Sequence, residues 1–400
     1  MGNFVSLADI DVKGKRVLVR ADLNVPVHLG AVSDDARIRK LLPTIKALTA
    51  RGAKVILLSH FGRPKGRDVT QSLRIILPVL EKLLGQKVEF AEDSIGKDTE
   101  QLVAGLSEGD VALLENLRFY PQEEANDKDF AAALALLGDV YVNDAFSAAH
   151  RAHASIEALA RLLPAAAGLL MQAELEALSK SLEQPVRPVA ALVGGAKIST
   201  KLDVLNNLVE KCDYLILGGG MANTFLLASG IAVGKSLKEA EMLESARNII
   251  AKAKNAGCEL VLPVDVVVST SFSADAEYQT VDVGNIPDDK MALDVGEKSV
   301  ARINQVLQQC KTLVWNGPLG AFELAPFAKG TVEVARCAAD LTAKGQLLSV
   351  AGGGDTMSAL ATAGVEEKFS YISSAGGAFL EWLEGKILPG VAVLPRKQAA

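Results

Sequence analysis

Residues 349–360 read SVAGGGDTMSAL and join the end of an apolar run to three glycines and the start of a helical pattern. The run at 346–352 predicts a buried strand. Gly352, Gly353 and Gly354 would then let the backbone approach a ligand at the N-terminus of the next helix, where free N–H groups bind phosphate oxygens. The familiar phosphate loop places a lysine directly after its glycines, and none follows here. A phosphate bound at this turn must therefore find its counter-charge elsewhere in the chain.

Strand and helix patterns alternate along the whole chain. Apolar runs predict buried strands at residues 16–20, 54–59, 111–115, 139–143, 188–193, 214–218, 259–263, 312–316 and 346–352. Between them, helical spacing predicts helices at residues 35–50, 72–84, 126–137 and 237–254. Such alternation is typical of parallel sheets covered by helices on both faces. We therefore predict an α/β fold with two Rossmann-like three-layer domains, whose sheets are mainly parallel, joined by a helical hinge.

The domain boundary is also visible in the sequence. A chain of 400 residues is too long for one ordinary core. A helical pattern begins at residue 170 and stops before Pro185 and Pro188, which cannot continue it. We predict an N-terminal domain at 1–183 and a C-terminal domain at 184–389. The tail, 390–400, carries one short apolar run that predicts either an added strand or packing elsewhere.

Composition narrows the class of protein. The formal net charge of −6 argues against nucleic-acid binding. No apolar run reaches the length of a membrane span, so we expect no membrane partner. The four cysteines form no C-x-x-C pair, which disfavours disulfides or a zinc site and fits a reducing, cytoplasmic location.

Polar and basic residues follow the predicted strands of the first half. They are Asp22, Asn24, His60, Arg63, Arg118, His150, Arg151 and His153, with Arg37 and Arg39 opening the first helical segment. Ligands of parallel sheets bind beyond the carboxyl ends of the strands, which share one edge. A single such arginine is more often a surface ion pair, but the recurrence predicts an anion site, because guanidinium groups match phosphate or carboxylate.

Glycines take the corresponding places in the second half. They occur in GGAK (194–197), GGGM (218–221), NGPLG (316–320), GGGD (352–355) and AGG (375–377). One such pair shows little, since tight strand–helix turns use glycine for steric reasons alone. Five of them on one edge favour a nucleotide-phosphate site.

Charged residues near these glycines complete the predicted site. Lys197 and Lys201 lie four residues apart, so we expect them on one face of a helix start, contacting either phosphate or solvent. Asp355 is a candidate Mg²⁺ ligand or a helix cap. Glu323 could accept a ribose hydroxyl, and both Asn316 and Glu323 could equally be caps or surface groups.

Three functions fit an anion site on one domain and a nucleotide site on the other. The first is phosphoryl transfer, in which catalysis is mostly positioning and charge neutralisation. The second is a Rossmann dehydrogenase, but GGGMAN ends in Asn223 instead of glycine, and Glu239 and Glu241 fall inside a helical pattern. The third is a non-catalytic sensor, which would not need Lys197 and Lys201.

Eight motifs together resemble the phosphoglycerate kinase family. They run in that family's order from residue 20 to residue 356, and the resemblance extends to about residue 377: RADLNVP, SHFGRPKG, LLENLRF, VNDAFSAAHRAHAS, GGAKISTK, GGGMANTF, LVWNGPLGAFE and GGGDT. The resemblance implies Mg²⁺-dependent transfer of the acyl phosphoryl group of 1,3-bisphosphoglycerate to ADP, giving 3-phosphoglycerate and ATP. It also implies a monomer whose tail returns to the first domain.

The resemblance assigns roles residue by residue. The implied triose-acid ligands are Asp22, Asn24, Arg37, His60, Arg63, Arg118 and Arg151. The implied nucleotide ligands are Gly195, Lys201, Gly219, Asn316, Glu323, Gly353, Gly354, Asp355 and Thr356, with Asp355 on the Mg²⁺. The residues implied around the migrating phosphoryl group are Arg37, Lys197, Lys201, Gly353 and Gly376.

Two short segments depart from the family's usual pattern. Ser147-Ala148 stand where Gly-Thr is common, and Ala375 stands where glycine is common. A positive φ at position 375 would strain alanine. No persuasive catalytic base is present, which fits a reverse reaction whose acceptor carboxylate is already ionised at pH 7.

Overall fold

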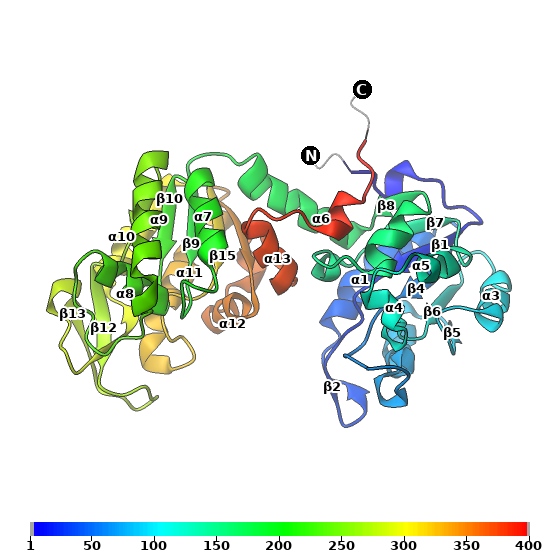
Figure 1. Ribbon diagram of the computed structural model, residues 1–400, viewed down its shortest axis with the longest axis horizontal. Coiled ribbons are helices and arrows are strands. Elements are labelled where there is room, and N and C mark those ends of the chain that lie inside the picture. Colours follow the sequence, from blue (N-terminus) through cyan, green and yellow to red (C-terminus); the bar gives the residue numbers. More distant parts are fainter. Residues whose placement is uncertain (1–3, 398–400) are drawn as a thin grey trace. The chain divides into compact units, whose positions relative to one another are not determined.

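The protein folds into two compact units in a computed structural model that describes residues 4–397 (Figure 1). One unit is Met1–Glu176 with Ile387–Ala400, and the other is Ala177–Lys386. The division falls inside the helical segment that the sequence marks as the link, shortly before the predicted boundary after residue 183.

The first unit is built on a six-stranded parallel sheet of order β5-β6-β4-β1-β7-β8. Its strands are β1 (Arg16–Arg20), β4 (Lys54–Leu58), β5 (Val88–Ala91), β6 (Val111–Leu114), β7 (Val140–Asn143) and β8 (Ala165–Ala167), beside a small hairpin of β2 (Val27–His28) and β3 (Ala31–Val32). Its helices are α1 (Ala36–Thr49), α2 (Leu77–Leu84), α3 (Lys97–Ala104), α4 (Pro121–Glu124) and α5 (Lys128–Ala135).

Periodic apolar residues explain this packing. On α1, Ile38, Leu41, Ile45 and Leu48 recur at helical spacing and are buried in the core. They pack in one cluster with Val17 and other buried residues of the central strands. Burying a strand on both faces needs an apolar run, and the four strands predicted in this half form as β1, β4, β6 and β7, whereas the edge strands β5 and β8 were not predicted.

The second unit repeats the scheme with a parallel sheet of order β11-β10-β9-β15-β16-β17. The strands are β9 (Val189–Val193), β10 (Tyr214–Leu217), β11 (Glu259–Val261), β15 (Thr312–Asn316), β16 (Leu348–Gly352) and β17 (Tyr371–Ser373). The helices are α7 (Leu202–Lys211), α8 (Gly219–Ala228), α9 (Leu243–Ala256), α10 (Glu297–Gln309), α11 (Lys329–Ala343), α12 (Gly354–Ala363) and α13 (Gly376–Leu383). The predicted α/β fold with two mainly parallel sheets is confirmed (Figure 1).

A three-stranded antiparallel sheet in the second unit was not predicted. It consists of β12 (Asp265–Ser269), β13 (Tyr278–Asp282) and β14 (Met291–Val295), in the order β13-β12-β14. β13 has no buried residue, so its sequence shows no apolar run to mark it.

The link and the tail are both helical. α6 (Leu169–Leu178) continues into a π-helical turn (Ser179–Glu183) that ends before Pro185. In the tail, α14 (Pro389–Ala392) forms, and one antiparallel bridge pairs Phe4 with Arg396. The backbone N–H of Gly390 donates to the carbonyl of Ala149 at 2.8 Å, so the tail contacts the first unit. Residues 398–400 of the predicted tail lie outside the described residues.

Candidate active site

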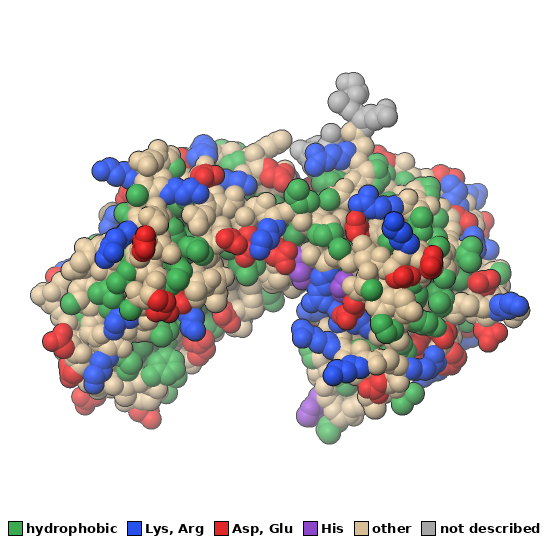
Figure 2. All heavy atoms as spheres, in the orientation of Figure 1, with side chains coloured by type: hydrophobic (Ala, Val, Ile, Leu, Met, Phe, Trp, Pro, Cys, Tyr) green, Lys and Arg blue, Asp and Glu red, His purple; other side chains and the backbone are tan. Residues whose placement is uncertain are grey.

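The carboxyl ends of the first unit's strands bring the predicted anion-binding residues to one edge. Because all six strands are parallel, the segments after β1, β4, β6 and β7 leave the sheet on the same side. These segments contain Asp22, His60, Arg118 and Arg151. The space-filling view shows Lys, Arg and His side chains gathered on one part of this unit (Figure 2).

Asp22 and Arg37 form the best-defined pair of this edge. The Arg37 guanidinium donates to Asp22 Oδ2 at 2.7 Å and to the carbonyl of Asn24 at 3.0 Å. Ser147 Oγ donates to the same Asp22 oxygen at 2.5 Å, so the Ser-Ala departure still supplies a hydrogen bond here. The Asn24 side chain accepts from the backbone N–H of Gly62 at 2.9 Å and ties the loop after β1 to the loop after β4.

Arg118 is held against the loop after β4. Its guanidinium donates to the carbonyl of Gly62 at 2.7 Å and lies 3.1 Å from a carboxylate oxygen of Glu124. The side chain is almost fully buried, and this burial lowers the pKa of Arg118. Arg63 differs, because it lies in an exposed part of the same loop, where its backbone N–H donates to the side chain of Gln71.

The histidines of this edge lie among arginines. Arg151 Nε lies 3.3 Å from Nε2 of the adjacent His150. Burial, followed by the charges of Arg20, Arg118 and Arg151, lowers the pKa of His60 far below its ordinary value. Burial and the same arginines lower the pKa of His153 to about 4. The charges of the same arginines therefore disfavour a positive charge on either ring.

Sequence reasoning did not assign Arg20 to the site. It is the last residue of β1 and is 1% exposed, and its guanidinium contacts Nδ1 of His60 at 3.2 Å. The sequence contains a sign of this, because an arginine directly follows the three apolar residues Val17–Val19 of the predicted strand. A buried arginine needs partners, which points to a polar cluster beneath the edge.

Lys201 is the fixed cation of the second unit. Its Nζ donates to the carbonyl of Gly194 at 2.7 Å, to Oδ1 of Asn316 at 2.7 Å and to the carbonyl of Asn316 at 3.1 Å. Burial lowers the pKa of Lys201 to about 8, against an opposing effect of Asp355. Because burial has already removed much of the hydration of the Lys201 ammonium, pairing with a phosphate would cost it little further desolvation.

The expectation that Lys197 and Lys201 share a helix face is wrong. Residues 194–201 form a loop, and Lys201 only caps α7, which begins at Leu202. The loop is held instead by Glu239, whose carboxylate accepts from the backbone N–H of Ser199 at 3.0 Å and from its hydroxyl at 2.5 Å. Lys197 is exposed at the surface of this loop.

The glycine turn of 352–354 is locked by Asn316 and Thr356. Asn316 Nδ2 donates to the carbonyl of Gly352 at 2.8 Å, and Thr356 Oγ1 accepts from the N–H of Gly317 at 2.7 Å. Gly353 precedes α12 with φ +101°, and a Cβ there would lie 2.9 Å from Asn316 Nδ2. Glycine is therefore required at this position for both conformation and space.

The glycine loops of the second unit meet one another. A Cβ on Gly376, the first residue of α13, would lie 3.9 Å from Cα of Gly353, so the starts of α12 and α13 are adjacent. A Cβ on Gly219, which has φ +67°, would lie 2.6 Å from the carbonyl oxygen of Gly195. Ala375 has φ −102°, so the strain considered for this position does not arise.

Asp355 and Glu323 are exposed carboxylates of the second unit. Asp355 is the second residue of α12 and lies close enough to Lys201 to affect its pKa. Among residues 4–397 no group of three or more His, Cys, Asp or Glu side chains could hold a metal ion. Asp355 alone fits Mg²⁺ that arrives on a nucleotide, because such an ion needs only one or two carboxylates besides phosphate oxygens and water.

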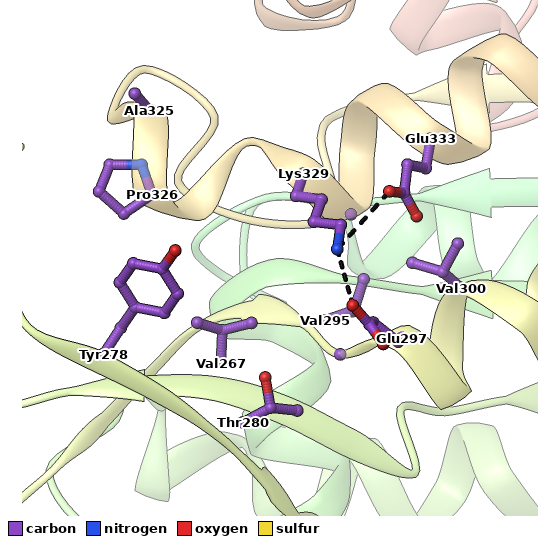
Figure 3. Close-up of a pocket in the computed structure, with 12 residues that line it drawn as sticks. Val267, Tyr278, Thr280, Val295, Glu297, Val300, Ala325, Pro326, Lys329 and Glu333 are labelled. Atoms are coloured by element: carbon purple, nitrogen blue, oxygen red, sulfur yellow. Dashed lines mark hydrogen bonds and ion pairs between the residues drawn. The ribbon is translucent and has the colours of Figure 1, made fainter.

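A cavity of about 350 Å³ lies elsewhere in the second unit, between the antiparallel sheet and the starts of α10 and α11 (Figure 3). Lys329 pairs with Glu297 at 2.7 Å and with Glu333 at 3.8 Å across it. The charged side chains that line this cavity are thus paired with one another, and no predicted site residue is among its lining residues.

The arrangement of both edges agrees with comparisons to known proteins. The family model described as phosphoglycerate kinase matches residues 7–386. This chain belongs to the phosphoglycerate kinase family. The phosphoglycerate kinase of Cereibacter sphaeroides strain ATCC 17025 is 59% identical over 97% of this chain and 98% of the relative. That of Allorhizobium ampelinum is 59% identical over 99% of this chain and 100% of the relative.

Solved phosphoglycerate kinases have the same fold. The structure of the Coxiella burnetii enzyme matches with a TM-score of 0.92 and 41% identity, covering 98% of each chain. The Pyrococcus horikoshii OT3 enzyme matches with a TM-score of 0.80 and 32% identity, again over 98% of each chain.

Family membership decides among the three functions left open by the sequence. The chain has phosphoglycerate kinase activity, a phosphotransfer with a carboxyl group as acceptor in glycolysis and gluconeogenesis. Its substrates are phosphoglycerate and adenine nucleotide, and the family generally uses the nucleotide with Mg²⁺. None of the helices described here is both long and apolar enough to cross a bilayer.

Proposed function

We propose that the first unit binds the triose acid, that the second binds the nucleotide, and that the acyl phosphoryl group of 1,3-bisphosphoglycerate passes directly to ADP. One observation carries this proposal. The first unit gathers arginines and histidines at its strand ends, whereas the second gathers glycine loops around Lys201. The first suits a small, highly charged acid, and the second suits a polyphosphate that approaches backbone N–H groups closely.

The triose acid is held by the residues after β1, β4, β6 and β7 and by one arginine of α1. These are Asp22, Asn24, Arg37, His60, Arg63, Arg118 and Arg151. Arg37 reaches the reacting group. Its guanidinium bonds through Nη1 to Asp22 and to the Asn24 carbonyl, and the side chain is 40% exposed. Its remaining N–H groups neutralise charge on the phosphoryl group in transfer.

The nucleotide is held by the glycine loops, Lys201, Asn316, Glu323 and Thr356, with Lys197, Gly353 and Gly376 near the transferred group. Thr356 acts mainly by position, since its hydroxyl already bonds to Gly317 and Gly352 within the protein. Glu323 is exposed and free of such a structural role in the described hydrogen bonds, which suits contact with a ribose hydroxyl.

Asp355 would hold the Mg²⁺ that accompanies ADP or ATP. The bound ion would neutralise phosphate charge. The Asp355 carboxylate lies at the start of α12, beside the N–H groups of Gly353 and Gly354, so this turn would hold the ion and the phosphate next to each other.

No base is needed in this mechanism. In the reverse direction the attacking group is the carboxylate of 3-phosphoglycerate, which is ionised at neutral pH. The chain therefore contributes cations and positioned N–H groups, and it excludes water as a competing acceptor when the domains close about the hinge.

The experiment that tests direct transfer follows the stereochemistry of a chiral, isotopically labelled thiophosphoryl group from nucleotide to 3-phosphoglycerate. Inversion at phosphorus is the expected result of a single in-line step. Retention would require two displacements and a phosphorylated protein group, and would contradict the proposal. Light scattering after gel filtration tests the accompanying proposal of a monomer, and cell fractionation tests a cytoplasmic location.

A further inference from the structure

We propose that Glu123 is a positioning residue that, through Ser155 and Arg20, fixes His60 as a neutral imidazole with its proton on Nε2. His60 then offers the triose acid a directed hydrogen-bond donor instead of one more cation. This inference rests on the proposed function of the first unit's edge. It concerns residues of that unit only, and Glu123, Ser155 and Arg20 are three residues that sequence reasoning did not assign.

Glu123 is a fully buried carboxylate at α4, and its side chain is 0% exposed. Oε2 accepts from the backbone N–H of Ser155 at 2.9 Å, and Oε1 accepts from the Ser155 hydroxyl at 2.5 Å. Nδ1 of His153 and the guanidinium of Arg20 each lie 4.0 Å from Oε1. A buried carboxylate is costly unless it is bonded and charge-compensated, and both conditions are met here.

The Ser155 hydroxyl has only one arrangement that satisfies both of its neighbours. A carboxylate oxygen can only accept, so the hydroxyl proton points to Glu123. Its oxygen is then free to accept from Nε of Arg20, which lies 2.8 Å away. Ser155 is itself fully buried, so water cannot provide an alternative partner without opening the cluster.

Arg20 transmits this orientation to His60. The guanidinium is planar, so fixing Nε on Ser155 and a terminal nitrogen on the carbonyl of Ala21 fixes the other terminal nitrogen as well. That nitrogen lies 3.2 Å from Nδ1 of His60. A guanidinium only donates, so Nδ1 must accept and cannot carry a proton. A ring with an unprotonated Nδ1 is neutral and has its N–H at Nε2.

The surroundings of His60 favour the same form. His60 is 7% exposed, Arg20 contacts its Nδ1, and the charges of Arg118, Arg151 and His153 also act on the ring. Burial and these cations all disfavour an imidazolium and lower the pKa of His60. In the described hydrogen bonds of residues 4–397, Arg20 is the partner of the ring, so Nε2 remains for a ligand.

A neutral donor has a use among so many arginines. Charge attraction alone would hold a small acid in several orientations, whereas an N–H of fixed direction selects one. Removal of Glu123 would leave the Ser155 hydroxyl and the Arg20 guanidinium without a fixed direction. The proton of His60 would then no longer be confined to Nε2.

The first test observes the tautomer directly and needs no variant and no substrate. The substrate-free protein is labelled with ¹⁵N-histidine, and two-bond proton–nitrogen correlation spectra are recorded at pH 7, with His60→Gln used to assign the His60 signals. We expect a neutral ring with N–H at Nε2. An imidazolium, or a ring with N–H at Nδ1, would overturn the proposal even if kinase activity is present.

The second test asks whether Glu123 controls the tautomer of His60. In Glu123→Gln, the amide N–H₂ faces a donor at one of its two positions, so we expect a mixture of His60 tautomers and a KM for 3-phosphoglycerate raised about tenfold, the size of one hydrogen bond. The KM for ATP should stay within twofold. Glu100→Gln, on the exposed first turn of α3, is the matched control and should change neither value.

Two further outcomes decide the matter. If Glu123→Gln alters both KM values equally, or lowers the melting temperature without changing the tautomer, Glu123 is only structural and the proposal is wrong. If that variant does not fold, Ser155→Ala replaces it, because it removes the same link while retaining the carboxylate. An unchanged His60 spectrum in Ser155→Ala would equally overturn the proposal, whereas absence of kinase activity in the wild type would overturn only the function on which it rests.

Discussion

Lys201 Nζ lies 2.7 Å from Oδ1 of Asn316, a residue at the end of a strand more than a hundred positions further along the chain. The same nitrogen lies 2.7 Å from the carbonyl of Gly194. Asn316 in turn donates to the carbonyl of Gly352 at 2.8 Å. The cation that the glycine turn at 352–354 lacks in sequence is therefore connected to that turn through one asparagine.

We predict that Lys201→Ala reduces kcat by about 100-fold to 1,000-fold, the usual cost of removing one preorganised charge-stabilising donor. The fold should persist, because the lysine bonds to oxygens of Gly194 and Asn316 at the ends of two strands that are already paired in the sheet. A coupled assay of ATP-dependent 3-phosphoglycerate phosphorylation measures this effect. Lys254→Ala, on an exposed position of α9, is the control, and equal losses in the two variants would remove Lys201 from the mechanism.

The lowered pKa of Lys201 predicts a pH dependence. Burial brings this pKa from 10.5 to about 8. The lysine is charged below that value, so kcat/KM for nucleotide should fall as pH rises through about 8 in the free enzyme. In Lys201→Arg the group stays charged, and the descending limb should move to higher pH even if the rate is reduced. A limb that stays at the same pH would assign the titration to another group.

The effect of the same group on stability has the opposite sign. Between about pH 8 and 10.5 the unfolded lysine binds a proton that the folded one has lost, so this group makes the protein more stable as pH rises through that window. Thermal unfolding across this range should show the wild type gaining stability relative to Lys201→Met as pH rises. A constant difference would contradict the lowered pKa.

Gly353→Ala tests why the turn before α12 requires glycine. The new Cβ would meet Asn316 Nδ2 at 2.9 Å, and φ is +101°. We expect a stability loss of about 1–3 kcal/mol together with a raised KM for nucleotide. Gly364→Ala is a matched control, because Gly364 also has positive φ, +68°, but faces open space. Gly364→Ala should lose about 1 kcal/mol of folding stability and leave the KM for nucleotide unchanged.

Arg37→Ala should collapse kcat while leaving ADP binding unchanged. Arg37 bonds to Asp22 and Asn24 in the first unit, and we place the nucleotide on the second. A loss of 100-fold or more in kcat, with the ADP dissociation constant from calorimetry within twofold, is the expected result. Arg39→Ala is the control, since Arg39 pairs with Asp35 on the solvent side of the same helix. An unchanged kcat would remove Arg37 from the transfer step.

The sequence predicted what depends on local patterns and missed what depends on packing. Most strands of both main sheets followed from uninterrupted apolar runs such as 189–193, because strands buried on both faces need them, whereas the edge strands β5 and β8 were not predicted. Strand β13 was missed because its residues are largely exposed. The site residues implied by the motifs stay predictions, but their convergence within each unit, such as Lys201 with Asn316, is now seen.

The errors in the predicted site have the same physical origin. Spacing of i, i+4 predicted a helix face for Lys197 and Lys201, yet the carboxylate of Glu239 bonds to Ser199 and holds that segment as a loop. Such a contact joins residues 40 positions apart and leaves no periodic trace. Likewise, only the fold shows that Arg20 contacts His60 and that the Glu123 carboxylate lies 4.0 Å from Arg20.

Asp355→Ala should weaken binding of Mg-nucleotide and leave 3-phosphoglycerate binding nearly intact. The carboxylate is exposed at the start of α12. Its removal should lower the folding stability only by the small contribution of a negative charge at a helix N-terminus. Asp98→Ala, in the first turn of α3, reproduces that helix effect and is the control. Calorimetry of ADP with and without Mg²⁺ separates the contributions, because loss of the ion's ligand should abolish most of the Mg²⁺-dependent gain in affinity. If that gain is the same in Asp355→Ala and in the wild type, Asp355 does not bind the ion.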